Sequence, residues 1–324
     1  MLRIAGIQMS CSEDPRKNLL RALDLLQIAA NMEARIVCLQ ELFHLPWFPR
    51  TSCSSDFGYA ESIAGETVER LREVARSRGM VLICPIFERE GDEGFYNSAV
   101  IIDQNGEILG GYRKNHVPYF PSYEERYYFK PGNLGFPVFK TEFATLGVQI
   151  SWDNFFPEGT RIMALAGAQV IFAPTAGAFL ESCGKWETVL RANAITNGLY
   201  VFRVNRAGGN SGLSFYGRSF CVDPHGESLT PPSGDHDGVV LADLDLEVID
   251  EVRYQWPFLK DRRGEIYGEL ATPSTSGIPL DRIWAAPQAS GRDGDLVAPT
   301  PDRIQQLGSE RAGSIANDLP RACD

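Results

Sequence analysis

The sequence lacks long hydrophobic runs and clusters of positive charge, and both absences exclude classes of protein. No stretch approaches the roughly 18 uninterrupted apolar residues that a membrane-spanning helix requires. The start, MLRIAGIQMS, is a short strand-like run without the longer apolar core of a signal peptide. The formal net charge of −11 disfavours nucleic acid and anionic membranes as partners, because binding phosphate groups requires clustered Lys and Arg.

The sequence also lacks the motifs of disulfide, metal and cofactor sites. Its seven cysteines show no CxxC pairing, and Cys38 and Cys84 lie inside apolar runs. We therefore expect buried thiols in a reducing, cytoplasmic compartment. The four histidines have no metal-binding spacing such as HExxH. The glycine-rich AGGNSG at 207–212 has no P-loop lysine, so we expect a tight loop there and neither a cofactor nor a metal.

Apolar runs of strand length alternate with segments of helical periodicity along most of the chain. RIAGIQM precedes NLLRALDLLQIAANMEA, and RIVCLQE precedes ESIAGETVERLREVARSRG. The alternation returns in LGVQIS, PEGTRIMALAGA, QVIFAPTA and KWETVLRANAITNG. This strand-helix alternation, with near-continuous Val, Ile and Leu in the strands, predicts an α/β fold with buried sheets. A hairpin signal at Asn105 and Gly106 predicts that the sheets are mixed.

From about Ala271 onward the composition changes. The stretch ATPSTSGIPLDRIWAAPQASGRDGDLVAPTPDR is rich in Pro, Gly, Ser and Ala and shows little periodicity. We therefore expect a main domain over residues 1–270 and a C-terminal extension over residues 271–324, which crosses the surface or reaches a neighbouring subunit.

Four polar residues stand at the ends of predicted strands or in the loops between them. Glu41 closes the strand in IVCLQE, Lys114 follows a hairpin strand in GYRKNHVP, and Ser151 ends LGVQIS. The carboxyl ends of strands are where open α/β sheets bind ligands. Glu125, in the tyrosine-rich loop SYEERYYF, could hold a lysine by a charged hydrogen bond. Each signal is weak alone, because a solvated side chain at a strand end is the simpler alternative.

Taken in order, these motifs resemble those of the nitrilase superfamily of carbon–nitrogen hydrolases. The resemblance covers about residues 1–270 and runs from LQELF through GYRKNHVP, YEERYYF, GVQISWDNFFPE, GAQVIFAPTA and GRSFCVDPHGE to RYQWPFLKDRRGEIYGEL. Within the superfamily, SWDNFFPE and RYQWPFLKDRR look most like the N-carbamoylputrescine amidase branch, which reads CWD..FPE at the first motif. Ser151 thus occupies the position of that family's nucleophilic cysteine.

The resemblance implies a four-layer α-β-β-α sandwich with mixed sheets and a Glu-Lys-Cys constellation at the strand ends. Glu41 would be the general base, and Glu125 would fix the position of Lys114. Lys114 and the backbone N–H of Trp152 would hold the oxyanion of the intermediate. The family's cysteine would attack an amide or carbamoyl carbon, expel ammonia and leave a thioester for hydrolysis.

A serine at the nucleophile position changes the expected chemistry. A thiol has a pKa near ~8.5, whereas a hydroxyl stays protonated and is a poor nucleophile beside a carboxylate base. Ser151 does not stand in a GxSxG elbow and has no histidine placed as its base, so a serine-hydrolase triad is disfavoured. We therefore expect binding with little turnover. An exchange made to trap a ligand and a natural non-catalytic binding protein both fit, and Cys183 in LESCGKWE is an alternative thiol.

The substrate class is only partly indicated by the sequence. The residues just after Ser151 carry no positive charge, which disfavours an anionic substrate. Tyr119 and Phe120 stand where the amine-binding branch has a small acidic turn, so a more apolar amide, another carbamoyl amine or a nitrile stays open. Substrate contacts are expected from Trp47, Tyr119, Asp153, Phe155 and Ala176.

The resemblance also implies self-association. Members of the family commonly pair subunits across the helices that follow the nucleophile. We therefore expect a homodimer or a larger homo-oligomer, with the extension from Ala271 at the interface.

Overall fold

The computed structural model describes residues 1–92, 94–210 and 212–271. The contacts within it divide the chain into two units, Met1–Asp261 and Arg262–Asp324. In its described part the second unit holds two short 3-10 helices, η5 (Gly264–Ile266) and η6 (Gly268–Ala271). The expected C-terminal extension over 271–324 lies, except for Ala271, outside the described residues, and the domain boundary at residue 270 stays a prediction.

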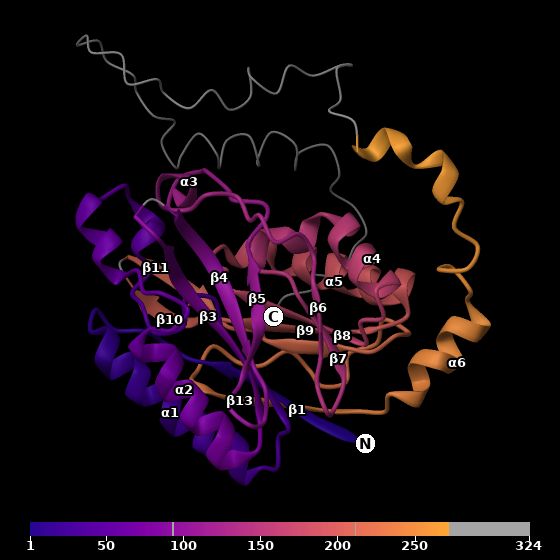
Figure 1. Cartoon of the computed structure of the whole chain (residues 1–324), viewed down its shortest axis with the longest axis horizontal. Coiled ribbons are helices and arrows are strands. Elements are labelled where there is room, and N and C mark those ends of the chain that lie inside the picture. Colours follow the sequence, from indigo (N-terminus) through magenta and orange to yellow (C-terminus); the bar gives the residue numbers. More distant parts are fainter. Residues whose placement is uncertain (93, 211, 272–324) are drawn as a thin grey trace, which may run out of the picture. The chain divides into compact units, whose positions relative to one another are not determined.

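The first sheet has six strands in the order β13-β1-β2-β3-β4-β5 (Figure 1). Their bounds are β1 Leu2–Gln8, β2 Ile36–Leu39, β3 Val81–Glu90, β4 Gly94–Ile102, β5 Ile108–Arg113 and β13 Gly238–Leu244. β1, β2 and β3 are parallel, and the other neighbours are antiparallel. The predicted hairpin joins β4 to β5, and its Gly106 has a φ of 80°, which glycine adopts without strain.

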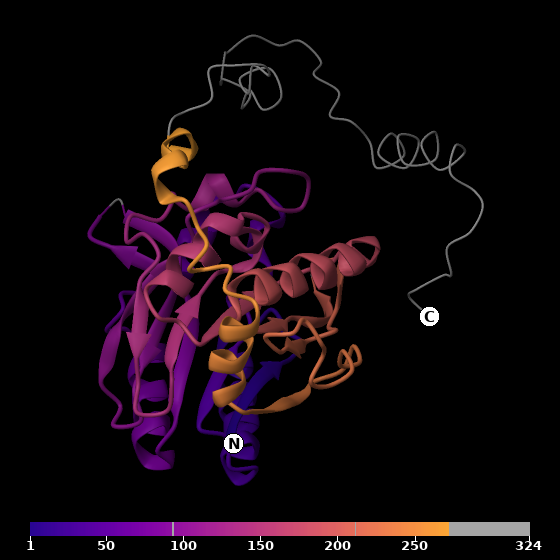
Figure 2. The same ribbon diagram turned by 90° about the vertical axis from the view of Figure 1, so that its right-hand side faces the viewer.

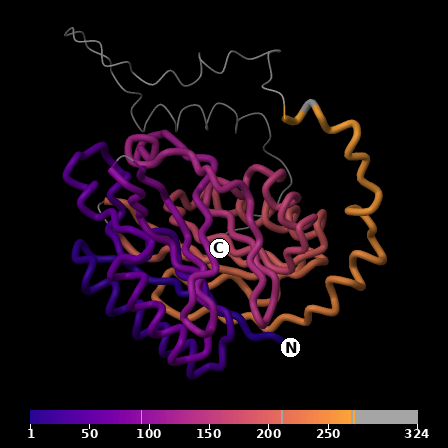
Figure 3. Tube along the Cα trace, in the orientation of Figure 1, coloured from indigo at the N-terminus to yellow at the C-terminus, as the bar shows by residue number. Residues whose placement is uncertain are grey.

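The second sheet has five strands in the order β12-β9-β8-β7-β6. Their bounds are β6 Val138–Lys140, β7 Thr145–Val148, β8 Val170–Thr175, β9 Tyr200–Asn205 and β12 Phe220–Val222. β7, β8 and β9 are parallel and the edge strands are antiparallel, so both large sheets are mixed, as predicted. A separate ribbon pairs β10 (Ala207–Asn210) with β11 (Leu213–Tyr216). Figure 3 follows the chain through the first sheet, then the second, and back to β13 beside β1.

The α-helices at 15–31, 66–78, 157–165 and 183–197 follow predicted helical segments, whereas a short helix at 125–128 lies where a loop was expected. The bounds of the α-helices are α1 Pro15–Asn31, α2 Glu66–Arg78, α3 Glu125–Tyr128, α4 Pro157–Leu165, α5 Cys183–Asn197 and α6 Glu247–Gln255. Short 3-10 helices of the first unit are η1 Phe48–Arg50, η2 Ser54–Tyr59, η3 Ser151–Phe155 and η4 Leu180–Ser182. Asp14 caps α1, because its carboxylate accepts hydrogen bonds from the backbone N–H groups of Arg16 and Lys17.

Three apolar clusters hold the first unit in four layers. One lies between the two sheets and includes Cys38 and Ile83 from the first sheet and Phe172 and Phe202 from the second. A second cluster joins the first sheet to α1 and α2, and a third joins the second sheet to α4 and α5. Figure 1 shows these helix pairs on opposite sides of the strands, and Figure 2 shows the same layers from the side. The predicted α-β-β-α sandwich is therefore confirmed.

The cysteines were expected to be buried thiols. Cys38 and Cys84 are fully buried, and loss of solvation raises the pKa of both thiols, so they are inert parts of the core. Cys53 is exposed, and Cys323 lies outside the described residues.

Among the described residues, no helix is both long and apolar enough to cross a lipid bilayer.

Candidate active site

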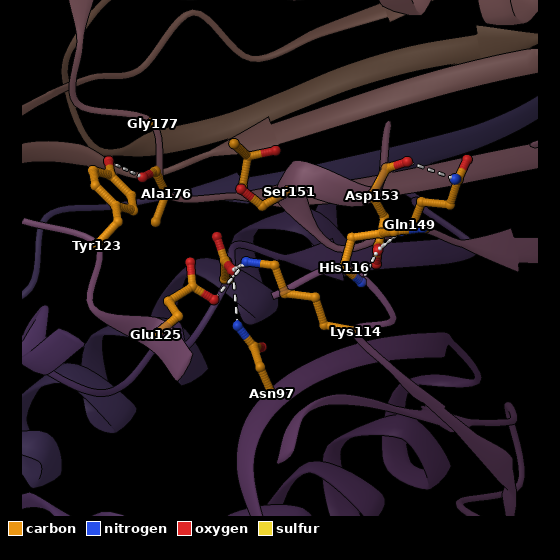
Figure 4. Close-up of polar contacts among 12 residues, drawn as sticks. Asn97, Lys114, His116, Tyr123, Glu125, Gln149, Ser151, Asp153, Ala176 and Gly177 are labelled. Carbon is orange, nitrogen blue, oxygen red and sulfur yellow. Dashed lines mark hydrogen bonds and ion pairs between the residues drawn. The ribbon is translucent and has the colours of Figure 1, made fainter. Parts of the chain in front are cut away.

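The predicted site residues come from the carboxyl ends of strands in both sheets. In the first sheet, Glu41 follows β2 and Lys114 follows β5 directly. In the second sheet, Ser151 follows β7 and begins η3. Glu125 begins α3 in the loop after Lys114. Figure 4 shows Ser151 across from the Lys114 ammonium group and the Glu125 carboxylate, so the chain brings these residues to one place.

Lys114 bridges the two predicted carboxylates. Its Nζ donates to Glu41 Oε1 at 2.9 Å and to Glu125 Oε2 at 2.6 Å. All three side chains are buried. An ammonium group carries three N–H donors, so these two bonds leave one donor for a further acceptor. Because both carboxylates accept hydrogen bonds from Lys114 Nζ, the third N–H of this ammonium group points in a fixed direction.

The electrostatics of this cluster are set by burial and by mutual charge. Burial opposes the charge of Lys114, but the nearby carboxylates of Glu125 and Glu41 outweigh it and raise the pKa of the lysine. Burial raises the pKa of Glu125 to about 7, although Lys114 acts against this shift. Lys114 is therefore held as a cation, and Glu125 is the carboxylate that takes up a proton readily near neutral pH.

Asn97 is a site residue that the sequence reasoning missed. It lies in β4, is buried, and donates from Nδ2 to Glu41 Oε1 at 2.8 Å. With Lys114 on the same oxygen, Glu41 is fixed from two sides, and its other oxygen, Oε2, has no hydrogen-bond partner within the described residues. The available signal was the amide of Asn97 at the start of NSAVII, which becomes apolar after Ser98, because a purely structural strand would not need a buried amide.

The backbone after Glu41 is held by a buried arginine. Arg206 donates from Nη2 to the carbonyl oxygens of Leu42 at 2.8 Å and Glu41 at 3.2 Å, and from Nη1 to that of Leu45 at 3.0 Å. Leu42 has a φ of 48°, in the left-handed region that non-glycine residues avoid. Arg206 thus stabilises a tight turn that directs Glu41 toward Lys114.

Ser151 also stands in a left-handed conformation, with a φ of 48°. A non-glycine residue there costs about 1–2 kcal/mol, and such strain persists when neighbours hold it. Asn154 does so, because its Nδ2 donates to the carbonyl oxygens of Gln149 and Ser151, both at 2.9 Å. The Ser151 residue is 8% exposed, so it is nearly buried yet accessible. Trp152, whose backbone N–H is the predicted oxyanion donor, follows it in η3.

Asp153 links the loop of Ser151 to the loop of Lys114. Its Oδ1 accepts from the backbone N–H of His116 at 2.8 Å and lies 2.8 Å from His116 Nδ1. Its Oδ2 accepts from the Tyr112 hydroxyl at 2.6 Å. Both oxygens of this fully buried carboxylate are thus used within the chain. These bonds give Asp153 a positioning role, and the substrate contact expected of it stays a prediction.

The other predicted substrate contacts have different environments. Trp47 is buried and donates from Nε1 to the Ser122 carbonyl at 3.0 Å. The Ala176 carbonyl accepts from the Tyr123 hydroxyl at 2.7 Å, beside Ser151 in Figure 4. Phe155 is half-buried, with its ring 5.3 Å from Trp152 and 4.6 Å from Trp186. Tyr119 is half-buried in the loop after Lys114.

The alternative thiol, Cys183, is buried in an apolar cluster. Cys183 begins α5 and packs in the apolar cluster on the helix side of the second sheet, with Trp186 and Leu190. Among the described residues, no group of three or more His, Cys, Asp or Glu side chains is arranged to hold a metal ion.

Comparison with known proteins gives consistent matches over most of the chain. The family model described as carbon-nitrogen hydrolase matches residues 3–254. N-carbamoylputrescine amidase from Solanum lycopersicum is 37% identical over 287 residues, covering 84% of this chain and 95% of that protein. A solved carbon-nitrogen hydrolase from Helicobacter pylori G27 has 34% identity and a TM-score of 0.79, covering 83% of this chain and 98% of that one.

A second solved structure shows the chemistry of a relative directly. The amidase from Nesterenkonia sp. AN1 has 31% identity and a TM-score of 0.70, covering 82% of this chain and 95% of that one. In one mutant of that amidase, the acetamide moiety of fluoroacetamide is covalently added at the active-site cysteine.

Proposed function

The chain belongs to the carbon–nitrogen hydrolase family, and on that premise we propose that its site binds an amide or N-carbamoyl amine for ammonia-releasing hydrolysis. The observation that carries this proposal is the Lys114 ammonium, buried and held by Glu41 and Glu125, beside Ser151. We further propose that Ser151 replaces the nucleophilic cysteine, so that this chain binds substrate and turns it over very slowly.

The proposed reaction has two halves, formation of an acyl-enzyme and its hydrolysis, and the same groups act in both. The nucleophile attacks the carbonyl carbon while its proton passes to Glu41, whose Oε2 has no other partner among the described residues. The remaining N–H of Lys114 and the backbone N–H of Trp152 stabilise the oxyanion. Collapse of this intermediate breaks the C–N bond, and Glu41 returns the proton to the departing ammonia. Water, deprotonated by Glu41, then cleaves the acyl-enzyme by the same steps in reverse.

Ser151 limits the first half of this reaction. A thiol beside a cation and a carboxylate base transfers its proton at little cost, whereas a serine hydroxyl is far less acidic. The exchange of sulphur for oxygen leaves the shape of the site nearly unchanged. Binding without efficient turnover is thus the expected behaviour of the chain, and a non-catalytic binding protein on the same scaffold is the second candidate function.

Ammonia release by Ser151→Cys tests the proposal. The variant and the unchanged chain are compared on simple amides, carbamoylputrescine, carbamoyl-β-alanine and aliphatic nitriles. Ser77→Cys, which adds a thiol at an exposed serine of α2, is the matched control. Release by Ser151→Cys alone supports a thiol hydrolase, and the best substrate distinguishes an amidase from a nitrilase. If no form releases ammonia although all of them fold, the result would refute hydrolysis and leave the binding function.

We also infer that the protein forms at least a homodimer. Apolar side chains are exposed on the helices after Ser151, namely Ile162 and Leu165 on α4 and Ile195 on α5. Water contact of such residues is unfavourable, and a second copy would remove it. Light scattering at micromolar concentration tests this inference, and a monomeric mass would contradict it. Ile162→Asp together with Leu165→Asp is expected to shift a dimer toward monomer.

A further inference from the structure

Four aromatic rings form a connected group beside Ser151. We name this group the aromatic mouth; it consists of Phe120, Tyr123, Trp152 and Phe179. The Phe120 ring lies 4.9 Å from Tyr123 and 5.7 Å from Trp152 between ring centroids. Phe179 closes the group, at 6.1 Å from Phe120 and 5.5 Å from Tyr123. These separations are those of favourable aromatic contacts.

The aromatic mouth reaches from the catalytic residues to solvent. At its inner end, Trp152 directly follows Ser151, and the buried Tyr123 donates to the Ala176 carbonyl beside Ser151 (Figure 4). At its outer end, Trp152 and Phe179 are 38% and 37% exposed. Large aromatic rings exposed together at a catalytic site indicate a surface that a ligand covers.

Four carboxylates next to the catalytic residues or the aromatic mouth have partners within the chain, whereas Glu181, two residues after Phe179, is exposed. Glu41 and Glu125 bind Lys114, and Asp153 binds His116 and the Tyr112 hydroxyl. Glu124 accepts from the Ser52 hydroxyl at 2.5 Å. The oxygens without a partner among the described residues, Glu41 Oε2 and Glu125 Oε1, belong to the two carboxylates that hold Lys114, where the amide carbon would react. A terminal ammonium group on a substrate that extends toward Trp152 would therefore lose hydration without reaching either oxygen.

Trp152 also lines a hollow that carries positively charged side chains. It measures about 550 Å³ and is lined by His116, Arg126, Lys130 and apolar or amide side chains. The described residues that line it include no carboxylate. Within a chain of net charge −11, this local positive charge repels an ammonium group that extends past Trp152.

We propose that the substrate is a neutral amide whose far end is an apolar group of aryl or branched-alkyl size, packed against Trp152, Phe120 and Phe179. This inference rests on the proposed hydrolase function and narrows its substrate class. The amide carbon lies at Ser151, and the apolar group covers the exposed ring faces. The competing alternative is an ammonium group attracted by the same rings, because aromatic faces also bind cations.

Two substrates of the same size separate these alternatives. Heptanamide and 6-aminohexanamide differ only in a terminal methyl or ammonium group, and 3-phenylpropanamide adds the aryl group. With Ser151→Cys, we expect kcat/KM to be about tenfold or more higher for heptanamide and 3-phenylpropanamide than for 6-aminohexanamide or carbamoylputrescine, as is usual for an apolar pocket. Calorimetric binding to the unchanged chain should follow the same order.

Variants then assign the preference to the aromatic mouth. Phe179→Ala in the Ser151→Cys background should reduce the preference for 3-phenylpropanamide over 6-aminohexanamide, mainly through KM. Trp256→Ala, at an exposed tryptophan after α6, is the matched control and should leave the preference unchanged. Glu181 is an exposed acid two residues after Phe179, and Glu181→Gln should also leave the substrate preference unchanged.

The failures of the two proposals are distinguishable. Turnover of 6-aminohexanamide or carbamoylputrescine at least as fast as heptanamide would overturn the neutral, apolar class while keeping the hydrolase. Turnover confined to the smallest amides would overturn it as well. No turnover of any amide would refute the proposed hydrolase and this inference together. If Phe179→Ala fails to fold, as judged by circular dichroism, Phe179→Leu gives the same comparison with a smaller change.

Discussion

Replacing Lys114 by methionine should destabilise the protein, and by more at high pH than at low pH. Methionine has a similar length, so the change removes the charge and leaves the volume nearly filled. Glu41 and Glu125 would then be two buried carboxylates without the cation that both now contact. Two like charges roughly 5 Å apart at an effective dielectric constant of about 20 repel by about 3 kcal/mol. This agrees with the roughly 3–5 kcal/mol typical of breaking a buried ion pair.

The pH dependence follows from the proton that the variant takes up. Burial already raises the pKa of Glu125 to about 7, and loss of Lys114 raises it further. A carboxyl group whose pKa is higher in the folded protein than in the unfolded chain binds more protons when folded, so stability falls as pH rises through that interval. We therefore expect the substitution to lower the free energy of unfolding by about 3 kcal/mol at pH 8.5 and by about 1 kcal/mol or less at pH 5.5.

Urea unfolding of Lys114→Met and the unchanged chain at both pH values measures this effect. Adding Glu125→Gln to Lys114→Met should recover most of the loss at pH 8.5, because one of the two charges is then gone. A loss of equal size at both pH values would refute the electrostatic account and indicate poor packing instead. A loss below about 0.5 kcal/mol at pH 8.5 would show that water reaches the carboxylates.

Two further predictions concern the residues that position the site. Asn97→Leu in the Ser151→Cys background should lower kcat at least about tenfold with little change in KM, because Glu41 loses one of its two holding bonds; an unchanged kcat in the ammonia assay would contradict this. Asp153→Asn should lower the free energy of unfolding by about 2 kcal/mol, since the amide nitrogen cannot accept the bonds that the carboxylate accepts now. Urea unfolding checks this, and a loss confined to kcat would contradict a structural link through His116.

The sequence predicted the strand-end residues better than the residues that hold them. Glu41, Lys114 and Ser151 follow apolar strands, and the ends of neighbouring strands meet in space whatever the details of the loops. Asn97 was missed because it lies inside a strand, where only the pairing of β4 with β5 places it next to Lys114. The order of the motifs suggested Glu125 as a partner of Lys114, but the periodicity of the sequence cannot predict where a residue between two strands lies.

Asp153 shows why side-chain direction was harder to predict than position. It is two residues from Ser151, and proximity in sequence suggested a substrate contact. In the short 3-10 helix η3, however, successive side chains diverge by about a third of a turn. Asp153 therefore faces His116 and Tyr112, whereas Trp152 faces solvent. No pattern of residue types in the sequence distinguishes these two directions.

The reacting groups sit on two different sheets, and this gives the packed layer between them the role of a spacer. Glu41 and Lys114 belong to the first sheet and Ser151 to the second, so the thickness of the side-chain layer that includes Phe172 and Phe202 sets the distance over which the proton must move. A shift of 1 Å in such a distance can cost about a hundredfold in rate. A substitution deep in that layer, far from any ligand, would thus change the rate of turnover by changing the separation of the two sheets.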